Sequence, residues 1–261
     1  MVLRQPLRFS LITATYNSAR TLERCLHSVR AQRHHDLEHL VVDGGSSDGT
    51  RDILTQNHQA GTLRLLCSEP DHSVYEAWNK ALNQISGDWV LFLGSDDWLA
   101  SPDSLAMAAQ AIEHHPEAEH CDFVCGHTLG SNGEHLGLTS SSWAWRHSDH
   151  LLNRLRGSLP LPAHPGVFHR ASLFSAGVGF DASYRICADQ KFLWQNDFGE
   201  RHCWIDVALS THQPGGLSQS KATAALHRHE RRRMLAELGR PRPAWIEPLL
   251  ALKDHLKYLN R

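Results

Sequence analysis

Short apolar runs alternate with amphipathic segments through the N-terminal part of the chain. The runs are rich in Val, Ile, Leu and Phe and are bounded by turn residues, which is typical of buried strands. They cover Phe9–Ala14, Leu37–Asp43, Thr62–Cys67 and Trp89–Leu93. Between them, apolar residues recur at helical spacing and predict helices at 22–29, 52–59 and 74–85. This order predicts an α/β fold with a mostly parallel central sheet flanked by helices.

Acidic residues follow three of these runs. Asp43 ends the second run, Asp71 lies in the turn after the third, and Asp96 and Asp97 follow the fourth. Because right-handed crossovers bring the ends of parallel strands to one edge of the sheet, we expect these carboxylates to converge on one crevice. Adjacent carboxylates repel one another unless a cation or water screens them. The set therefore favours a metal or a hydrogen-bond-donating ligand over a solvated turn.

The pattern becomes less regular after the fourth run. A helix is predicted from Ser101-Pro102 to about His114. Further strands are predicted at 121–126, 167–170 and 203–207, and helices at 149–155, near Ser172 and at 188–196. The segments 128–145 and 211–220 are rich in Gly and Ser and predict loops, and 160–165 predicts an extended segment.

The C-terminal tail differs in composition from the rest of the chain. Two helices separated by Pro241 and Pro243 are predicted between residues 222 and 261. The first carries four arginines, Arg228, Arg231, Arg232 and Arg233. One interpretation is a solvated helix face. The other is a basic surface for anionic lipid headgroups, which attract each clustered Lys or Arg by roughly 1 kcal/mol.

Composition narrows the class of protein. The 261 residues are 41% hydrophobic, enough for a sizeable core, and the formal net charge of −2 gives no indication of nucleic-acid binding. No apolar run reaches the ~20 residues that span a bilayer, and the N-terminus shows no signal-peptide pattern. The six cysteines are scattered, so we expect reduced, buried thiols. These features predict a cytoplasmic protein.

Six segments in order resemble those of glycosyltransferase family 2. They are FSLITATYN, LVVDGGSSDGT, SEPDHSVYEAWNKAL, SGDWVLFLGSDDWL, HPGVFHRASLF and ADQKFLW, and together they span about residues 8–220. The resemblance implies an inverting enzyme of the GT-A fold, a Rossmann-like α/β architecture, that uses nucleotide-diphosphate sugars. It implies a catalytic domain at 1–220, with a nucleotide-sugar-binding half at 1–127 and an acceptor half at 128–220. Residues 221–261 remain as a helical C-terminal appendage.

The resemblance also implies roles for residues that bind the donor. Thr13, Ala14 and Tyr16 match the wall of the nucleobase site, with Tyr16 able to stack on the base. Asp43 matches the residue that accepts hydrogen bonds from the base. Asp71 and Lys80 match positions near the ribose and the diphosphate, although Lys80 fits a surface lysine equally well.

Metal and catalytic roles follow from the same resemblance. Asp96 and Asp97 match the metal motif, with Asp96 also on the donor side, and imply Mn²⁺ or Mg²⁺. Many relatives carry a further Asp where this chain has Gly94, which leaves the division of roles within the pair open. Asp189 matches the general base, although Ala188 replaces a common Glu. By its position alone, Asp189 is better explained as a carboxylate favoured at a helix N-terminus, and the resemblance reverses that preference.

The expected function is transfer of a sugar, with a UDP-sugar as the favoured donor, to a glycan or lipid-linked acceptor in cell-surface polysaccharide biosynthesis. His164 and His212 match acceptor-side positions, and His164 is also explained as a surface histidine. A peripheral membrane contact through the basic tail is a further expectation, and no nucleic-acid partner is expected. Two alternatives remain: a non-catalytic nucleotide-sugar-binding or assembly protein, favoured by Gly94 and Ala188, and a sugar nucleotidyltransferase, which would need a basic Gly-rich loop after the first strand.

Overall fold

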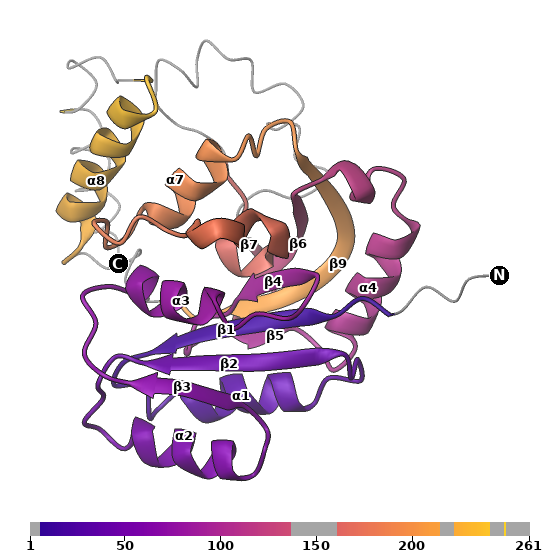
Figure 1. Ribbon diagram of the computed structural model, residues 1–261, viewed down its shortest axis with the longest axis vertical. Helices are drawn as coiled ribbons and strands as arrows, with labels where there is room; N and C mark the ends of the chain where they lie inside the picture. The colour runs from indigo at the N-terminus through magenta and orange to yellow at the C-terminus, as the bar shows by residue number, and fades with distance from the viewer. Residues whose placement is uncertain (1–5, 137–160, 215–221, 241–247, 249–261) are drawn as a thin grey trace.

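A single nine-stranded sheet forms the centre of the computed structural model, which describes residues 6–136, 161–214, 222–240 and 248 (Figure 1). The strand order is β3-β2-β1-β4-β8-β6-β9-β5, and β7 pairs with β6 outside this path. The first four strands pair in parallel: β1 (Phe9–Thr15), β2 (Leu37–Asp43), β3 (Arg64–Ser68) and β4 (Trp89–Phe92). The predicted parallel sheet is therefore confirmed for this half.

The second half continues the same sheet with mixed pairing. β8 (Val167–Arg170) runs antiparallel between β4 and β6 (Phe123–Gly130), and β9 (His202–His212) runs parallel to β6. The short β5 (Trp98–Leu99) and β7 (His135–Leu136) pair antiparallel with β9 and β6. β6 and β9 consequently run in the same direction as β1 to β4.

Helices cover both faces of the sheet (Figure 1). They are α1 (Leu22–Arg30), α2 (Thr50–Gln59), α3 (Val74–Leu82), α4 (Ser104–His114), α7 (Ala188–Gln195) and α8 (Ala224–Glu237). Short 3₁₀ helices span Ala118–His120, His164–Gly166 and Ala171–Gly177. The last of these is the short helix expected near Ser172.

Alternation along the strands divides the apolar core into two layers. Leu11 of β1 and Leu91 of β4 pack with residues of α1 and α4, whereas Ile12 and Val90 pack with α3, α7 and α8. Strands buried on both faces read as continuous apolar runs, which is why β1, β2 and β4 were visible in the sequence, whereas the edge strand β3 is only half-buried. The six cysteines are unpaired thiols, and all but the half-buried Cys67 are buried, as expected.

Several predicted boundaries are wrong. β6 continues to Gly130 and β9 to His212, into segments expected to be loops, and β5 and β7 were not predicted. The helix expected to begin at Ser101-Pro102 begins at Ser104. The errors in the strands share a cause. The added strand residues are held by pairing with distant strands, and such pairing leaves no local pattern in the sequence. The predicted helix at 149–155 and the second tail helix lie outside the described residues.

The helix α8 packs against the body of the molecule. Its Met234 and Leu235 are each 1% exposed and belong to the same apolar cluster as α3, α7 and the sheet. The apolar core is thus continuous from the first strand to α8, and the boundary predicted at residue 220 separates segments that share it. The domain division itself stays a prediction.

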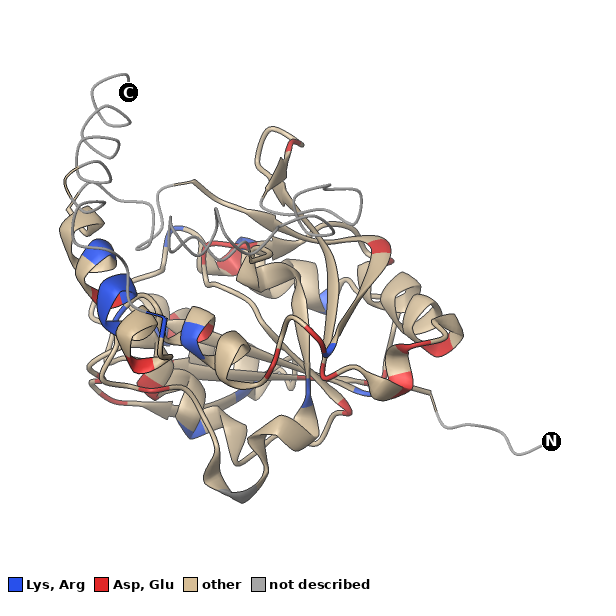
Figure 2. Ribbon diagram, turned by 90° about the horizontal axis from the view of Figure 1, so that it is seen from above, with Lys and Arg blue, Asp and Glu red and all other residues tan. Residues whose placement is uncertain are grey.

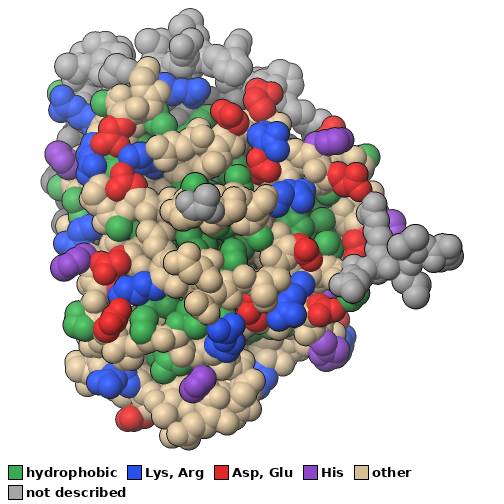
Figure 3. All heavy atoms as spheres, viewed as in Figure 1, with side chains coloured by type: hydrophobic (Ala, Val, Ile, Leu, Met, Phe, Trp, Pro, Cys, Tyr) green, Lys and Arg blue, Asp and Glu red, His purple; other side chains and the backbone are tan. Residues whose placement is uncertain are grey.

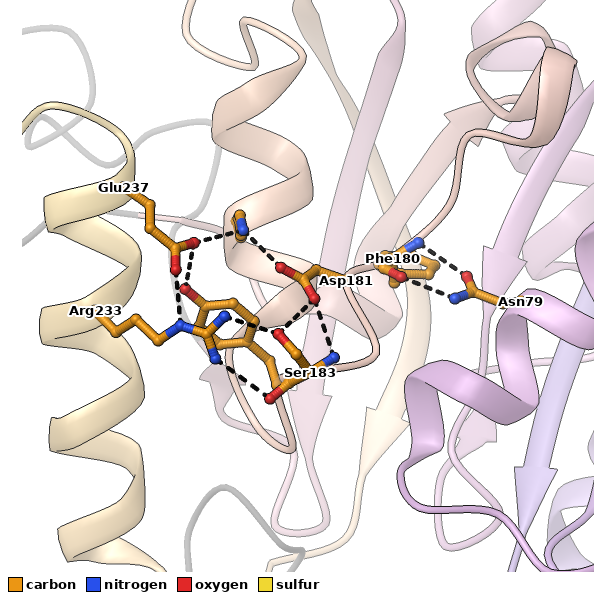
Figure 4. A network of polar contacts seen from close by, with 8 residues as sticks. Asn79, Phe180, Asp181, Ser183, Arg233 and Glu237 are labelled. Carbon is orange, nitrogen blue, oxygen red and sulfur yellow. Dashed lines mark hydrogen bonds and ion pairs between the residues drawn. The ribbon is translucent and has the colours of Figure 1, made fainter.

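Polar contacts also join α8 to α7 and to the loop that precedes it (Figure 4). The Lys191 ammonium of α7 donates to Asp181 at 2.7 Å and to Glu237 of α8 at 2.6 Å. The Tyr184 hydroxyl donates to the same Glu237 carboxylate at 2.8 Å, and Arg233 donates to its other oxygen at 2.7 Å. Glu237 therefore connects three segments through one carboxylate.

Charged side chains of both signs are intermixed over the surface (Figures 2 and 3). Figure 3 shows no large field of one sign on the face it presents. Among the described residues, no helix combines the length and apolar character needed to cross a bilayer.

The pH dependence of stability tests the Glu237 network. The hydrogen bond from Lys191 lowers the pKa of Glu237 to about 2, from an ordinary 4.5. Because the folded-state pKa is depressed, this carboxylate stabilises the fold above about pH 4.5, and the contribution is lost as pH falls toward 2. Its side chain is 36% exposed, so solvent screening limits the effect to about 1 kcal/mol. We expect Glu237→Gln to lower the Tm by about 2–4 °C at pH 7.

The difference in Tm between Glu237→Gln and the wild-type protein should shrink by more than half at about pH 3. Thermal unfolding followed by circular dichroism at several pH values measures it. The exposed Glu200 provides the matched control, since Glu200→Gln should produce no pH-dependent gap. A Glu237→Gln gap that stays constant from pH 7 to pH 3 would contradict the ionic origin of the contact.

Candidate active site

The carboxylate of Asp43 ties the ends of three strands together. Asp43 is fully buried and accepts hydrogen bonds from the hydroxyls of Thr15 on β1 and Ser68 on β3, at 3.0 and 2.6 Å. The Ser46 amide and hydroxyl donate to it as well. Burial raises the pKa of Asp43, but the hydrogen bonds from Ser46, Ser68 and Thr15 outweigh it and hold the pKa below its ordinary value. These four donors match the acceptor capacity of a carboxylate, so Asp43 fixes the strand ends, and its contact with a nucleobase stays a prediction.

Asp71 lies beside the same strand end. A Cβ atom built on Gly44 would lie 2.7 Å from Asp71 Oδ2, so this carboxylate packs against the backbone of Gly44. Burial raises the pKa of Asp71, and the ammonium of Lys80 partly offsets it. Lys80 itself forms an ion pair with Glu69 at 2.9 Å. The convergence expected for Asp43 and Asp71 is therefore present, while Lys80 is engaged by a surface acid.

Asp96 and Asp97 converge in front of Gly94. A Cβ atom on Gly94 would lie 2.8 Å from Asp96 Oδ1 and 2.8 Å from Asp97 Oδ2, so one carboxylate oxygen of each residue borders the same small space. Asp97 is 3% exposed. Burial, together with the charge of Asp97, raises the pKa of Asp96. Asp97 is therefore buried and Asp96 half-buried, so the acidic pair does not lie in a fully solvated turn.

His212 lies next to this pair. Its Nδ1 is 2.8 Å from Asp97 Oδ1, and the backbone amide of Gln213 donates to the same oxygen at 3.0 Å. The hydrogen bond to Asp97 raises the pKa of His212. The structure places His212 at the end of β9, beside the acidic pair, and its expected role on the acceptor side stays a prediction.

Arg24 joins the loops around the acidic pair. Its guanidinium donates to the Asp96 carbonyl at 3.0 Å and to Gln213 Oε1 at 3.1 Å, and it stacks 3.7 Å above the ring centre of Trp98. Arg24 lies on the polar face of α1. The apolar residues that predict this helix give no signal for a role of Arg24.

Asp189 lies in the first turn of α7 and is held by a residue of α3. The hydroxyl of Tyr75 lies 2.9 Å from Asp189 Oδ1 and 2.6 Å from the carbonyl oxygen of Ile186, and these two acceptors share its single proton. Burial raises the pKa of Tyr75 well above its ordinary value, so the phenol stays a neutral donor. Tyr75 lies in the first turn of α3, four residues after Asp71, so α3 connects the turn that carries Asp71 with Asp189. Nothing in the sequence pattern distinguished Tyr75 from other core residues.

His164 is packed in an aromatic cluster between α3 and β4. Its ring stacks on Trp78 at 5.2 Å and on Phe92 at 5.5 Å between centres. Burial lowers the pKa of His164, and the nearby Asp189 carboxylate only partly reverses it. The buried Nε2 of His164 and Nε1 of Trp78 have no hydrogen-bond partner among the described residues. The ring is therefore a neutral component of the wall near Asp189, not a surface histidine.

The three residues expected to line a nucleobase differ in accessibility. Tyr16 is 65% exposed and free to stack, and Ala14 is half-buried. Thr13 is fully buried and its hydroxyl is 3.0 Å from His39 Nε2. Because alternation turns Thr13 toward the layer of α1 and α4, we leave it out of the proposed site.

The described part of the chain contains no complete set of metal ligands. Across the described ranges, no cluster of three or more His, Cys, Asp and Glu side chains is arranged to hold a metal ion. A divalent cation at Asp96 and Asp97 would have to take its other ligands from substrate phosphates and water, which is how Mg²⁺ is commonly held.

Comparisons with known proteins agree with this architecture. A curated relative from Mycobacterium bovis BCG, named a PGL/p-HBAD biosynthesis glycosyltransferase, is 34% identical over 205 residues, covering 78% of this chain and 72% of the relative. The M. tuberculosis glycosyltransferase Rv1514c, whose function is uncharacterized, is 32% identical over 197 residues, covering 70% of this chain and 66% of that protein.

Solved structures of glycosyltransferases share the fold. The crystal structure of S. aureus TarS 1-349 with UDP-GlcNAc has a TM-score of 0.66 and 25% identity, covering 89% of this chain. This chain spans 66% of the length of that TarS chain. The mannosyltransferase PcManGT from Pyrobaculum calidifontis, in complex with GDP-Man and Mn²⁺, has a TM-score of 0.65 at 18% identity, covering 97% of this chain and 70% of that one. These neighbours have the GT-A fold, which confirms the predicted fold class.

The family model described as Glycosyl transferase family 2 matches residues 10–176, a segment that includes β1 to β4, the acidic pair and β8. With this match and the relatives above, the chain belongs to glycosyltransferase family 2.

Proposed function

We propose that the protein is an inverting, metal-dependent glycosyltransferase that moves a sugar from a nucleotide-diphosphate sugar to a hydroxyl group of a glycan or lipid-linked acceptor. The observation that carries the proposal is the convergence of Asp96 and Asp97 at Gly94, at the end of β4 in a chain of this family. Neighbours crystallised with UDP-GlcNAc and with GDP-Man support a nucleotide-sugar donor, and we favour a UDP-sugar.

In this proposal the nucleotide lies along the ends of β1 to β3. The exposed ring of Tyr16 stacks on the base, next to Ala14, and Asp71 accepts hydrogen bonds from the ribose. Asp43 acts indirectly, because its bonds fix the strand ends that carry these groups. Lys80 contributes charge from its ion pair with Glu69 and makes no direct contact.

Asp96 and Asp97 fit a hard divalent cation such as Mn²⁺ or Mg²⁺. Their oxygens border one space, the ligands are carboxylates, and the pKa of Asp96 is raised by burial and by its neighbour, so a cation there relieves repulsion. The bound ion would supply Lewis-acid stabilisation of the charge on the departing diphosphate. His212 fixes one oxygen of Asp97 and leaves Oδ2 facing the space at Gly94.

Asp189 is the proposed general base. It takes the proton of the acceptor hydroxyl while that oxygen forms a bond to the anomeric carbon. The bond from this carbon to the diphosphate oxygen breaks on the opposite side, its electron pair stays on the diphosphate, and the configuration inverts. Because Tyr75 occupies Asp189 Oδ1, we assign the proton to Oδ2.

The basic tail does not add a membrane contact to the proposal. Arg233 is engaged by Glu237 and by Ser183, and α8 packs through its apolar residues into the core. A cytoplasmic location and a role in cell-surface polysaccharide biosynthesis remain part of the proposal through the family alone.

A screen of donors tests the proposed activity directly. Purified protein is incubated with UDP-glucose, UDP-GlcNAc, UDP-galactose and GDP-mannose with 1 equivalent or excess of Mn²⁺, and released nucleoside diphosphate is measured. We expect slow hydrolysis of one UDP-sugar, abolished by EDTA, because water can replace the acceptor. Binding of nucleotide without any turnover in this screen, with or without added glycan acceptors, would favour the non-catalytic binding protein.

The missing side chain at Gly94 provides a test of the cation site. In Gly94→Ala the new methyl group would meet both carboxylates, so their oxygens must separate. We expect Mn²⁺-dependent affinity for UDP to fall by about tenfold, equivalent to about 1.4 kcal/mol. Calorimetric titration with and without Mn²⁺ measures it. Gly199→Ala is the control, since a Cβ there meets nothing within 4 Å. Equal affinity in the two variants would place the cation elsewhere.

Replacement of the proposed base separates chemistry from binding. Asp189→Asn keeps the shape of the side chain but cannot take a proton, so we expect kcat to fall by ~10²–10⁴ with UDP affinity within about twofold of wild type. Asp52 provides a matched control, because it is also an acid in the first turn of a helix but is exposed on α2. Turnover of Asp189→Asn close to that of Asp52→Asn would refute the assignment.

A further inference from the structure

A buried acid on α8 binds the backbone segment that precedes α7. Glu230 is 4% exposed and accepts hydrogen bonds from three consecutive amides: Arg185 at 2.7 Å, Ile186 at 2.8 Å and Cys187 at 3.1 Å. Each of these bonds is charge-assisted, which makes it stronger than a bond between neutral groups. The proposed mechanism does not use Glu230, yet the segment it binds ends two residues before Asp189.

The same segment is held from the opposite side by α3. The Tyr75 hydroxyl contacts both the Ile186 carbonyl oxygen and Asp189 Oδ1, at 2.6 and 2.9 Å, and shares its one proton between them. The amide of Ile186 therefore binds Glu230 and its carbonyl binds Tyr75. Since one phenol contacts both the segment and Asp189, a shift of residues 185–187 changes the position of the Asp189 carboxylate relative to α3.

We propose that Glu230 is a positioning residue for Asp189, acting through residues 185–187. In this proposal α8 is part of the catalytic apparatus, because its carboxylate fixes the backbone that sets the direction of the base. The inference rests on the proposed function, in which Asp189 is the base. A displacement of about 1 Å in such a group can reduce the rate by ~10².

The competing explanation is that Glu230 only fixes α8 to the molecule. The helix offers a control for this, because Met234 is 1% exposed in the apolar core, whereas the three hydrogen bonds to the amides of 185–187 are made by Glu230. Met234→Ala creates a cavity and weakens the docking of α8, with a cost of about 2–5 kcal/mol. Glu230→Ala weakens the docking and also releases the three amides.

The test compares Glu230→Ala and Met234→Ala with wild type, using the most active donor of the screen above. We expect Glu230→Ala to lower kcat by about 10- to 100-fold with the donor KM within about twofold, and Met234→Ala to change kcat by less than about threefold. Hydrogen exchange should become faster at the amides of 185–187 in Glu230→Ala and stay near wild type in Met234→Ala. If Glu230→Ala does not fold, Glu230→Gln, which keeps one acceptor oxygen, replaces it with a smaller expected loss of kcat.

The outcomes distinguish a failure of the positioning role of Glu230 from a failure of the proposed glycosyltransferase activity. Faster exchange at 185–187 with unchanged kcat, or unchanged exchange, would overturn the positioning role alone. An equal loss of kcat in Glu230→Ala and Met234→Ala would show that only docking of α8 matters. A wild-type protein that turns over no nucleotide sugar would overturn the proposed function and the positioning role with it.

Discussion

Burial of negative charge at the ends of parallel strands is the constraint on which this structure depends. A carboxylate without water must be paired or fully hydrogen-bonded, or it costs several kcal/mol. Asp43 meets this requirement with donors from β1, β3 and the loop after β2. The consequence is a rigid edge, since the strand ends cannot separate without exposing that carboxylate. The loops after β1, β2 and β3, which carry Tyr16 and Asp71, begin from this edge.

The acidic residues in and near the crevice fall into two groups, according to how many of their carboxylate oxygens are hydrogen-bonded within the chain. Asp43 and Glu230 are satisfied within the chain, by four and by three donors. Asp96 and Asp97 instead share a space that Gly94 leaves open, and Asp189 uses one oxygen on Tyr75. Internally satisfied acids fix the backbone, and acids with remaining acceptor capacity are available to ligands. Burial alone therefore does not distinguish the two groups. The number of hydrogen-bond donors that each carboxylate finds within the chain does.

Local patterns explain how much of this was predictable. The first four strands and the acids at their ends were predicted because apolar runs and turn residues are properties of adjacent positions. The face on which Thr13 lies follows from the same alternation, since Phe9, Leu11 and Thr13 share one face of β1. The pairing of His212 with Asp97 could not be predicted, because it requires β9 to extend beside β5 and β6, and such contacts have no local signal.

The role of α8 shows how composition can hide a structural signal. Its arginines suggest a solvated helix, yet Leu226, Glu230, Met234 and Leu238 recur at intervals of four and lie on one side of it. The three apolar members pack on the core formed by α3, α7 and the sheet. Burying a carboxylate within an apolar stripe costs free energy unless hydrogen-bond donors or a cation contact it. Its presence there therefore predicts backbone amides or a cation on the surface against which the helix packs. Here the partner is the backbone before α7. Through Glu230, α8 is therefore in direct contact with the segment that leads to Asp189.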